Sequence, residues 1–81
     1  MNRIELEKKL LELGIPSGEF SIDGIKHYEA TCLVHENDKW KVVYKDRSHI
    51  VPLQEFDTEK EACEFIYVKM KKDYGYIKPK A

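Results

Sequence analysis

Two runs of alternating side chains, separated by a short polar segment, constrain the fold of this chain most strongly. The even positions of residues 28–34 carry Tyr, Ala, Cys and Val, and those of residues 40–44 carry Trp, Val and Tyr. A period of two is typical of β-strands. Between the runs lies Glu36-Asn37-Asp38, in which Asn and Asp tolerate the positive φ of tight hairpin turns. We therefore predict two antiparallel strands joined by this turn.

A third strand is expected directly after the hairpin. Asp46-Arg47-Ser48 forms the second turn and residues 49–56 form the strand. Pro52 has no N–H to donate to a neighbouring strand, which favours a position at the edge of the sheet. Upstream of the hairpin, residues 17–24 are expected to form a loop with a short extended piece at residues 20–22.

The residues before this loop have the pattern of an amphipathic helix. In residues 2–14, Leu6, Leu10 and Leu13 recur with the spacing of one helix face. Gly14 is suited to the C-terminal cap, and Pro16 prevents continuation of the helix.

A second helix is predicted after the strands. It begins at Asp57 or Thr58, Thr58 and Glu61 have the spacing of a capping box, and Phe56 precedes them as a hydrophobic staple. Its inner face is expected to carry Ala62, Phe65, Ile66 and Met70. Gly75 is predicted to end the helix, and residues 76–81 to form a loose tail.

These elements predict an α+β domain of the order α-β-β-β-α. Its three strands form an antiparallel meander, and both helices pack on one face because each has a single apolar stripe. A chain of 81 residues is too short for a second domain or a large buried substrate cavity. We assign residues 1–75 to one domain.

Composition indicates the compartment and excludes several classes of protein. The net charge is -1, whereas proteins that bind nucleic acid or anionic membranes usually carry excess Lys and Arg. The chain shows neither a secretory signal pattern nor the roughly 20 apolar residues of a membrane span. Cys32 and Cys63 have no neighbouring Cys, so we interpret them as reduced, buried thiols. A cytoplasmic protein without membrane contact is expected.

The histidines are the first candidates for catalysis or metal binding. His27 and His35 are eight residues apart, which on a straight strand is about 26 Å at ~3.3 Å per residue. That distance is too large for a shared metal or proton, and His49 is more distant in sequence. No phosphate-binding, metalloprotease or nucleophile-elbow motif is present. We therefore expect no catalytic residue, metal ligand or cofactor, and interpret the chain as non-enzymatic. The alternative, a small hydrolase or metal-dependent enzyme, would require the three histidines to converge in space.

Double-stranded-RNA-binding domains share the element order α-β-β-β-α, and this resemblance provides an alternative function. In that family a basic Ser-Lys-Lys-like run begins the second helix and contacts phosphates. Here the corresponding run is Thr58-Glu59-Lys60-Glu61-Ala62, in which carboxylates would repel a phosphate backbone. Nucleic acid is therefore the less favoured partner, with the basic residues 69–80 as a secondary contact.

Three segments together resemble another family. They are Leu13-Gly14-Ile15-Pro16, the strand and turn from Trp40 to Ser48, and the helix start from Phe56 to Phe65. This order is similar to that of small bacterial immunity proteins of polymorphic toxin systems, of the contact-dependent inhibition type. The resemblance covers residues 4–72. Ser48 stands where the pattern has Gly, so the second turn departs from it.

The resemblance implies stoichiometric binding of a protein toxin domain encoded nearby, with its active site occluded. Many such toxins are nucleases with basic clefts, which an acidic surface would attract. The expected partner-binding residues are Glu36, Asp38, Asp46, Arg47, Glu55, Asp57, Glu59 and Glu61. Trp40, Tyr44 and Phe65 are assigned to the core, and Tyr67, Tyr74 and Tyr76 to exposed anchors. Homodimerisation through the uncovered face of the sheet is a further alternative.

Overall fold

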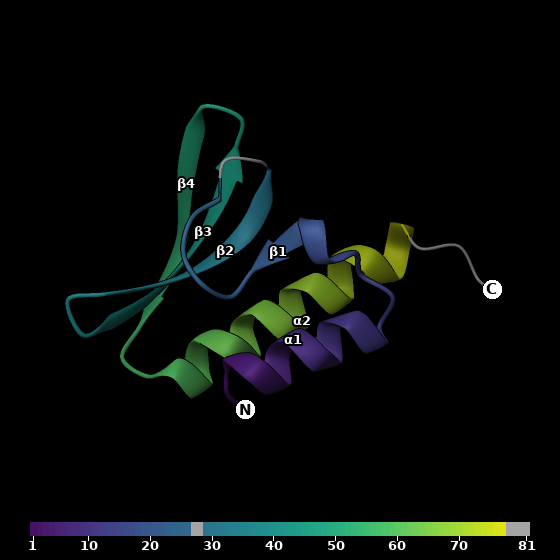
Figure 1. Cartoon of the computed structure of the whole chain (residues 1–81), viewed down its shortest axis with the longest axis horizontal. Helices are drawn as coiled ribbons and strands as arrows, with labels where there is room; N and C mark the ends of the chain where they lie inside the picture. Colours follow the sequence, from purple (N-terminus) through teal and green to yellow (C-terminus); the bar gives the residue numbers. More distant parts are fainter. Residues whose placement is uncertain (27–28, 78–81) are drawn as a thin grey trace.

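The computed structural model describes residues 1–26 and 29–77, with side chains described up to residue 73. Its elements follow the order α1 (Arg3–Glu12), a short 3₁₀ helix (Ser17–Glu19), β1 (Phe20–Ser21), β2 (Ala30–Glu36), β3 (Lys39–Asp46), β4 (His49–Phe56) and α2 (Glu59–Ile77). The expected α+β class is confirmed, with the strands lying between two helices in the sequence (Figure 1).

The sheet has four strands in the order β1-β2-β3-β4, so the expectation of a three-stranded meander is wrong in its count. The short extended piece predicted near residues 20–22 becomes β1, which pairs parallel to β2 through Phe20 opposite Thr31. The remaining pairs are antiparallel, as predicted. β4 is an edge strand that contains Pro52, consistent with the missing N–H of proline.

The two faces of the sheet carry separate apolar clusters. Leu33 of β2 lies opposite Val42 of β3, and both belong to the main core. Their neighbours Cys32 and Val43 are also opposite one another, and with Ala30 they form a second, smaller cluster. Since successive side chains of a strand point to opposite faces, the second cluster lies on the face away from Leu33.

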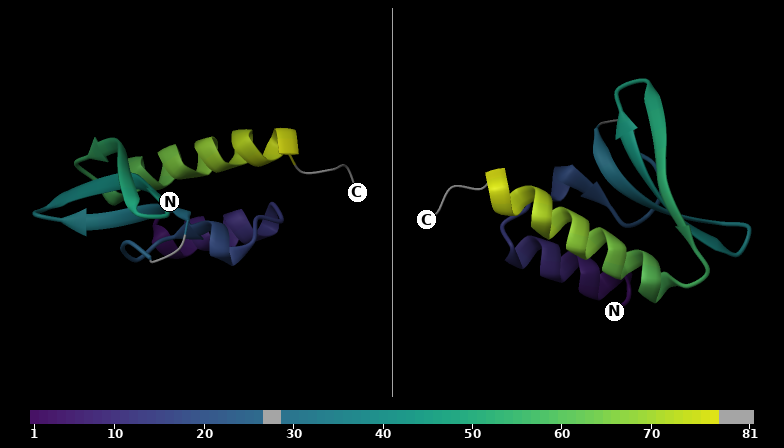
Figure 2. Two further views of the ribbon diagram at one scale, coloured as in Figure 1. Left: turned by 90° about the horizontal axis from the view of Figure 1, so that it is seen from above. Right: turned by 180° about the vertical axis from the view of Figure 1, so that it is seen from behind.

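The main core joins both helices to one face of the sheet. Leu6 and Leu10 of α1 and Ala62 and Ile66 of α2 are buried with Leu33. α2 contacts β2, β3 and β4, whereas α1 packs mainly against α2. The two helices lie side by side and begin at the same end of the molecule (Figures 1 and 2).

Local capping explains where the helices begin and where α1 ends. The Asn2 side chain accepts a hydrogen bond from the N–H of Glu5, and the Glu5 carboxylate accepts one from the N–H of Asn2. Gly14, with φ of 87°, follows the end of α1 as predicted. Thr58 caps α2 through the N–H of Glu61.

The predicted end of the second helix is wrong. α2 continues through Gly75 to Ile77, so the expected domain limit at residue 75 falls inside the helix. A glycine costs about 1 kcal/mol relative to alanine in a helix but does not by itself terminate it. Residues 78–81 of the expected tail lie outside the described residues.

Candidate protein-binding surface

The turn between β2 and β3 and the start of α2 come together at one end of the sheet. Trp40 of β3 lies opposite Phe56, the last residue of β4. This register places Lys39 beside Asp57, and these two residues form an ion pair. Lys41 lies 3.0 Å from a Glu36 oxygen and 3.9 Å from a Glu55 oxygen. We call this region the tip surface; it consists of Glu36, Asp38, Lys39, Lys41, Glu55 and Asp57.

The tip surface is a mixed-charge surface, with lysines interleaved among the expected partner-binding acids. The hydrogen bond from Lys39, followed by its positive charge, holds the pKa of the Asp57 carboxyl below its ordinary value. The same hydrogen bond and the charge of Asp57 raise the pKa of Lys39. Asp38 is exposed in the turn between β2 and β3, with φ of 62°.

Two of the expected partner-binding residues lie elsewhere. Asp46 and Arg47 occupy the turn between β3 and β4, at the other end of β3 from Lys39. From Lys39 to Asp46 the eight residues of β3 make seven steps, which at ~3.3 Å each place the two ends of the strand about 23 Å apart. Arg47 instead lies 3.3 Å from a Glu29 oxygen. The structure therefore separates Asp46 and Arg47 from the other expected partner-binding residues by the length of β3.

Glu59 and Glu61, also expected to contact a partner, make structural contacts at the start of α2. A Glu59 oxygen accepts a hydrogen bond of 2.8 Å from the backbone N–H of Arg3 and lies 3.4 Å from Nε of that residue. The Glu61 N–H donates to the Thr58 hydroxyl, which is one half of the predicted capping box, and the Glu61 carboxylate accepts from that hydroxyl instead of from the Thr58 backbone N–H. Sequence periodicity did not reveal the Arg3–Glu59 contact because 56 residues separate its partners.

Trp40 is half-buried beside the tip surface, where it stacks on a histidine. The rings of His35 and Trp40 are 3.8 Å apart with an interplanar angle of 5°. The guanidinium of Arg3 lies 5.6 Å from the centre of the Trp40 ring, within cation–π range. Trp40 was expected in the core, and its packing against the core is confirmed. The contacts of Trp40 with the exposed His35 and the half-buried Arg3 were not anticipated.

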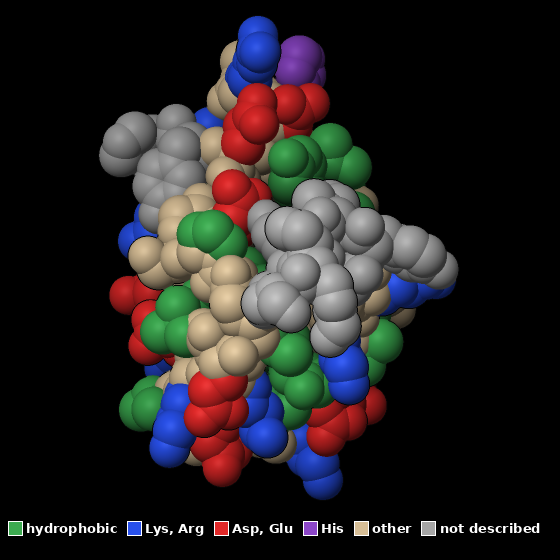
Figure 3. All heavy atoms as spheres, turned by 90° about the vertical axis from the view of Figure 1, so that its right-hand side faces the viewer, with side chains coloured by type: hydrophobic (Ala, Val, Ile, Leu, Met, Phe, Trp, Pro, Cys, Tyr) green, Lys and Arg blue, Asp and Glu red, His purple; other side chains and the backbone are tan. Residues whose placement is uncertain are grey.

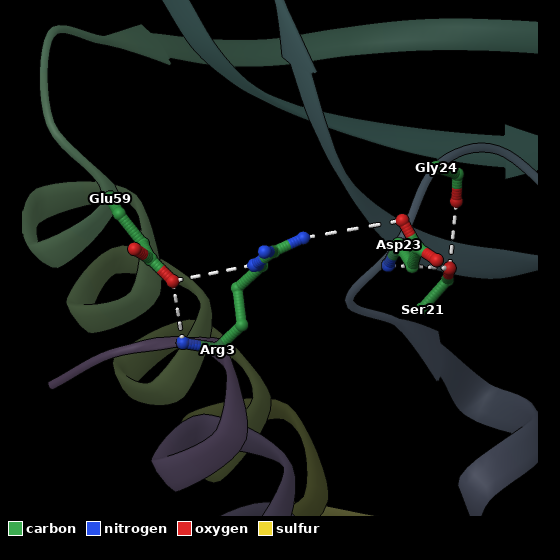
Figure 4. A network of polar contacts seen from close by, with 5 residues as sticks. All are labelled: Arg3, Ser21, Asp23, Gly24 and Glu59. Carbon is green, nitrogen blue, oxygen red and sulfur yellow. Dashed lines mark hydrogen bonds and ion pairs between the residues drawn. The ribbon is translucent and has the colours of Figure 1, made fainter.

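Next to this stack lies a hollow of about 120 Å³, lined among others by Arg3, Asp23, His35 and Trp40. We call it the Trp40 hollow. The side chain of Arg3 crosses from Glu59 toward Asp23, with 4.0 Å between its Nη1 and an Asp23 oxygen (Figure 4). The start of α1, the loop after β1 and the β2–β3 hairpin thus contribute to one small site.

The loop that carries Asp23 is fixed by its own hydrogen bonds. The buried Ser21 hydroxyl donates to the Gly24 carbonyl at 2.7 Å and accepts from the Asp23 N–H at 3.3 Å (Figure 4). The Gly24 N–H donates to the carbonyl of Leu33 at 2.9 Å. Gly24 has φ of 89°, which favours glycine. The Asp23 carboxylate therefore projects from an ordered turn.

The titratable groups considered for chemistry are dispersed. His35 is near the tip surface and His49 is at the opposite end of β4, so these two do not converge; His27 lies outside the described residues. Cys32 and Cys63 are free and buried, as expected. Burial, followed by the charge of Glu59, raises the pKa of the Cys63 thiol to about 11. Within residues 1–26 and 29–77, no cluster of three or more metal-binding side chains occurs.

The remaining aromatic and core assignments are partly confirmed. Phe65 is half-buried and packs on Phe56, with 5.4 Å between ring centres. Tyr44 is half-buried, and burial followed by the charge of Glu29 raises its pKa. Tyr67 packs partly on the core with Lys9 and Lys71 near its ring, so it is less exposed than expected. The side chains of residues 74 and 76, the other expected anchors, lie outside the described residues.

The charges at the start of α2 and along its length bear on the duplex-RNA alternative. The start of α2 carries Asp57, Glu59 and Glu61, where that reading requires cations. Lys69 pairs with Asp73 at 2.9 Å. On the face where the two helices end, acidic and basic side chains are interspersed over the described part of the surface (Figure 3).

Comparisons with known proteins identify no family for this chain. No protein-family model matches it, and neither curated proteins nor solved structures give a significant match. Across the described helices, none has the length and apolarity needed to cross a membrane.

Proposed function

We propose that this protein is a non-enzymatic immunity protein that binds a bacterial toxin domain in the cytoplasm and covers its active site. The observation that carries the proposal is the arrangement of a half-buried Trp40, flanked by Arg3 and His35, next to an exposed rim of carboxylates and lysines. Energetically dominant interface residues are enriched in Trp and Arg and are surrounded by a polar rim. The resemblance to immunity proteins supplies the class of partner.

The charges of the rim support a basic partner. Glu36 and Asp57 have side chains that are 58% and 76% exposed, so solvent and an approaching protein can both reach them. A nuclease cleft that binds phosphates carries Lys and Arg, to which these carboxylates are complementary. Lys39 and Lys41 place positive charges among these carboxylates. We therefore expect the pattern of charges to define the orientation of the bound partner, and the net negative charge of the surface to raise its rate of association.

Co-purification with the toxin domain encoded next to this chain tests the proposal. We expect a one-to-one complex and loss of toxin activity on addition of this protein. A neighbouring protein without a toxin-like C-terminal domain, or a toxin domain that forms no complex and stays active, would contradict the proposal. Retardation of duplex RNA in a gel shift at low salt, absent in a variant with Lys60→Glu, would favour the RNA-binding alternative instead.

Charge reversal locates the interface on the molecule. A variant with Glu36→Lys, Asp38→Lys and Glu55→Lys should associate with the toxin domain at least tenfold more slowly at low ionic strength, because it removes charges that attract the basic cleft. The matched control reverses three exposed carboxylates away from the tip surface, Glu7→Lys, Glu12→Lys and Asp46→Lys, so that the net charge of the two variants is the same. Equal association rates for the two variants would place the interface away from the tip surface.

A further inference from the structure

We propose that the Trp40 hollow is the binding pocket for a single arginine side chain of the protein partner. The inference deepens the proposed function, since it rests on the partner being a protein with a basic surface. Its basis is the coincidence of three features in one place: a small volume, an ordered and exposed carboxylate, and a wall of stacked aromatic rings.

The volume of the hollow selects a side chain over a metabolite. Sites for drug-sized ligands usually have volumes of about 300–1,000 Å³, whereas this hollow has about 120 Å³. A cavity of about 150 Å³ is large enough to hold benzene. A planar guanidinium with the methylene groups next to it is of this size, and the rest of the partner would remain outside.

Asp23 provides the acceptor for such a group. Its side chain is 88% exposed, and its contact with Arg3 is long at 4.0 Å. The carboxylate therefore keeps acceptor positions for two parallel hydrogen bonds, the geometry in which guanidinium and carboxylate pair most strongly. Because Ser21 fixes the turn on which Asp23 stands, little conformational entropy is lost when the partner binds.

The rings of His35 and Trp40 provide the wall of the pocket. Guanidinium groups stack on aromatic rings more readily than ammonium groups do. This molecule already holds one guanidinium near Trp40, that of Arg3 at 5.6 Å. The positive charge of Arg3 is balanced by Glu59 at 3.4 Å and by Asp23, which reduces its repulsion of a second cation.

The same charges disfavour an anion. A carboxylate or phosphate entering the hollow would lie close to the Asp23 carboxylate that lines it, and it would compete with Glu59 and Asp23 for Arg3. Arginine is therefore the side chain that matches the charge, the shape and the stacking surface together.

Trp40 is the only tryptophan of the chain, so its fluorescence reports on the hollow directly. The probe is the blocked tripeptide acetyl-Gly-Arg-Gly-amide, added to the full-length protein. Its neutral isostere acetyl-Gly-citrulline-Gly-amide is the matched control ligand. We expect a saturable fluorescence change with a dissociation constant in the millimolar range for the arginine peptide, and binding of the citrulline peptide at least tenfold weaker.

Substitutions then test the assigned contacts. Asp23→Asn should weaken binding of the arginine peptide about tenfold, whereas Asp46→Asn in the distant turn should leave it unchanged; circular dichroism verifies that both variants are folded. The inference is overturned by a non-saturable response, by equal binding of the two peptides, or by equal binding to wild type and Asp23→Asn. Failure of the peptide to bind while the toxin complex forms would overturn this inference alone. Saturable peptide binding without a toxin complex would overturn the proposed function and leave the pocket assignment in place.

Discussion

The contact between Arg3 and Glu59 connects the starts of the two helices, and Glu59→Gln tests how much it contributes. In the native protein the backbone N–H of Arg3 donates to a Glu59 carboxylate oxygen at 2.8 Å. Gln keeps a side-chain oxygen that can accept this hydrogen bond. The substitution removes the negative charge that lies 3.4 Å from Nε of Arg3 and that stands at the first residue of α2. It therefore isolates an electrostatic contribution at nearly constant shape.

Two terms determine the size of the effect. The Arg3 and Glu59 side chains are 44% and 31% exposed, so solvent screens their attraction and the pair contributes ~0.2–1 kcal/mol. A carboxylate at a helix N-terminus contributes a further ~0.3–1 kcal/mol through the helix dipole. We expect Glu59→Gln to lower the free energy of unfolding by about 1 kcal/mol, which for a domain of this size corresponds to a Tm about 4–8 °C lower.

Urea unfolding followed by Trp40 fluorescence measures the difference. The matched control is Glu64→Gln on the same helix, an exposed residue five positions further along, whose substitution should change stability by less than about 0.5 kcal/mol. In 1 M NaCl, where the screening length is about 3 Å, the effect of Glu59→Gln should fall by at least half. A loss equal to that of Glu64→Gln, or one that salt leaves unchanged, would refute the electrostatic reasoning.

Three further predictions concern the fold around the site. Leu33→Ala should lower the free energy of unfolding, measured in urea, by about 2–5 kcal/mol, because Leu33 is 1% exposed in the main core. Val68→Ala, at an exposed position, should change stability little. Similar losses for the two variants would contradict the assignment of Leu33 to the core. Lys39 lowers the pKa of Asp57, so their pair stabilises the fold above the ordinary carboxyl pKa and is lost as pH falls through the folded value. Asp57→Asn should therefore reduce the pH dependence of stability in acid, and an unchanged acid-unfolding profile would argue against the pair. Gly24→Ala should lower the free energy of unfolding by about 1–2 kcal/mol through backbone strain alone, because φ is 89° and no atom lies within 4 Å of the added Cβ. The control Gly18→Ala also meets open space but has no positive φ, so it should be tolerated. Equal effects of the two substitutions in thermal unfolding would exclude strain as the cause.

Local patterns in the sequence were sufficient for most of the elements. The alternation around Glu36-Asn37-Asp38 predicted the hairpin, because strand periodicity and positive-φ turn residues act within a few positions. Thr58 and Glu61 predicted the start of α2 for the same reason. Gly14 predicted the end of α1, yet Gly75 did not end α2, because glycine permits a helix end but does not impose one.

The site required contacts that no local pattern encodes. The sequence by itself determined two helices, a hairpin and an edge strand that carries proline, since each depends on periodicity or on the conformational limits of single residues. Tertiary structure decided that β1 joins the sheet, that Asp46 and Arg47 lie away from the other acids, and that Arg3, Asp23, His35 and Trp40 share one hollow. The physical reason is that these contacts join segments distant in the sequence, and they form only when the core brings those segments together.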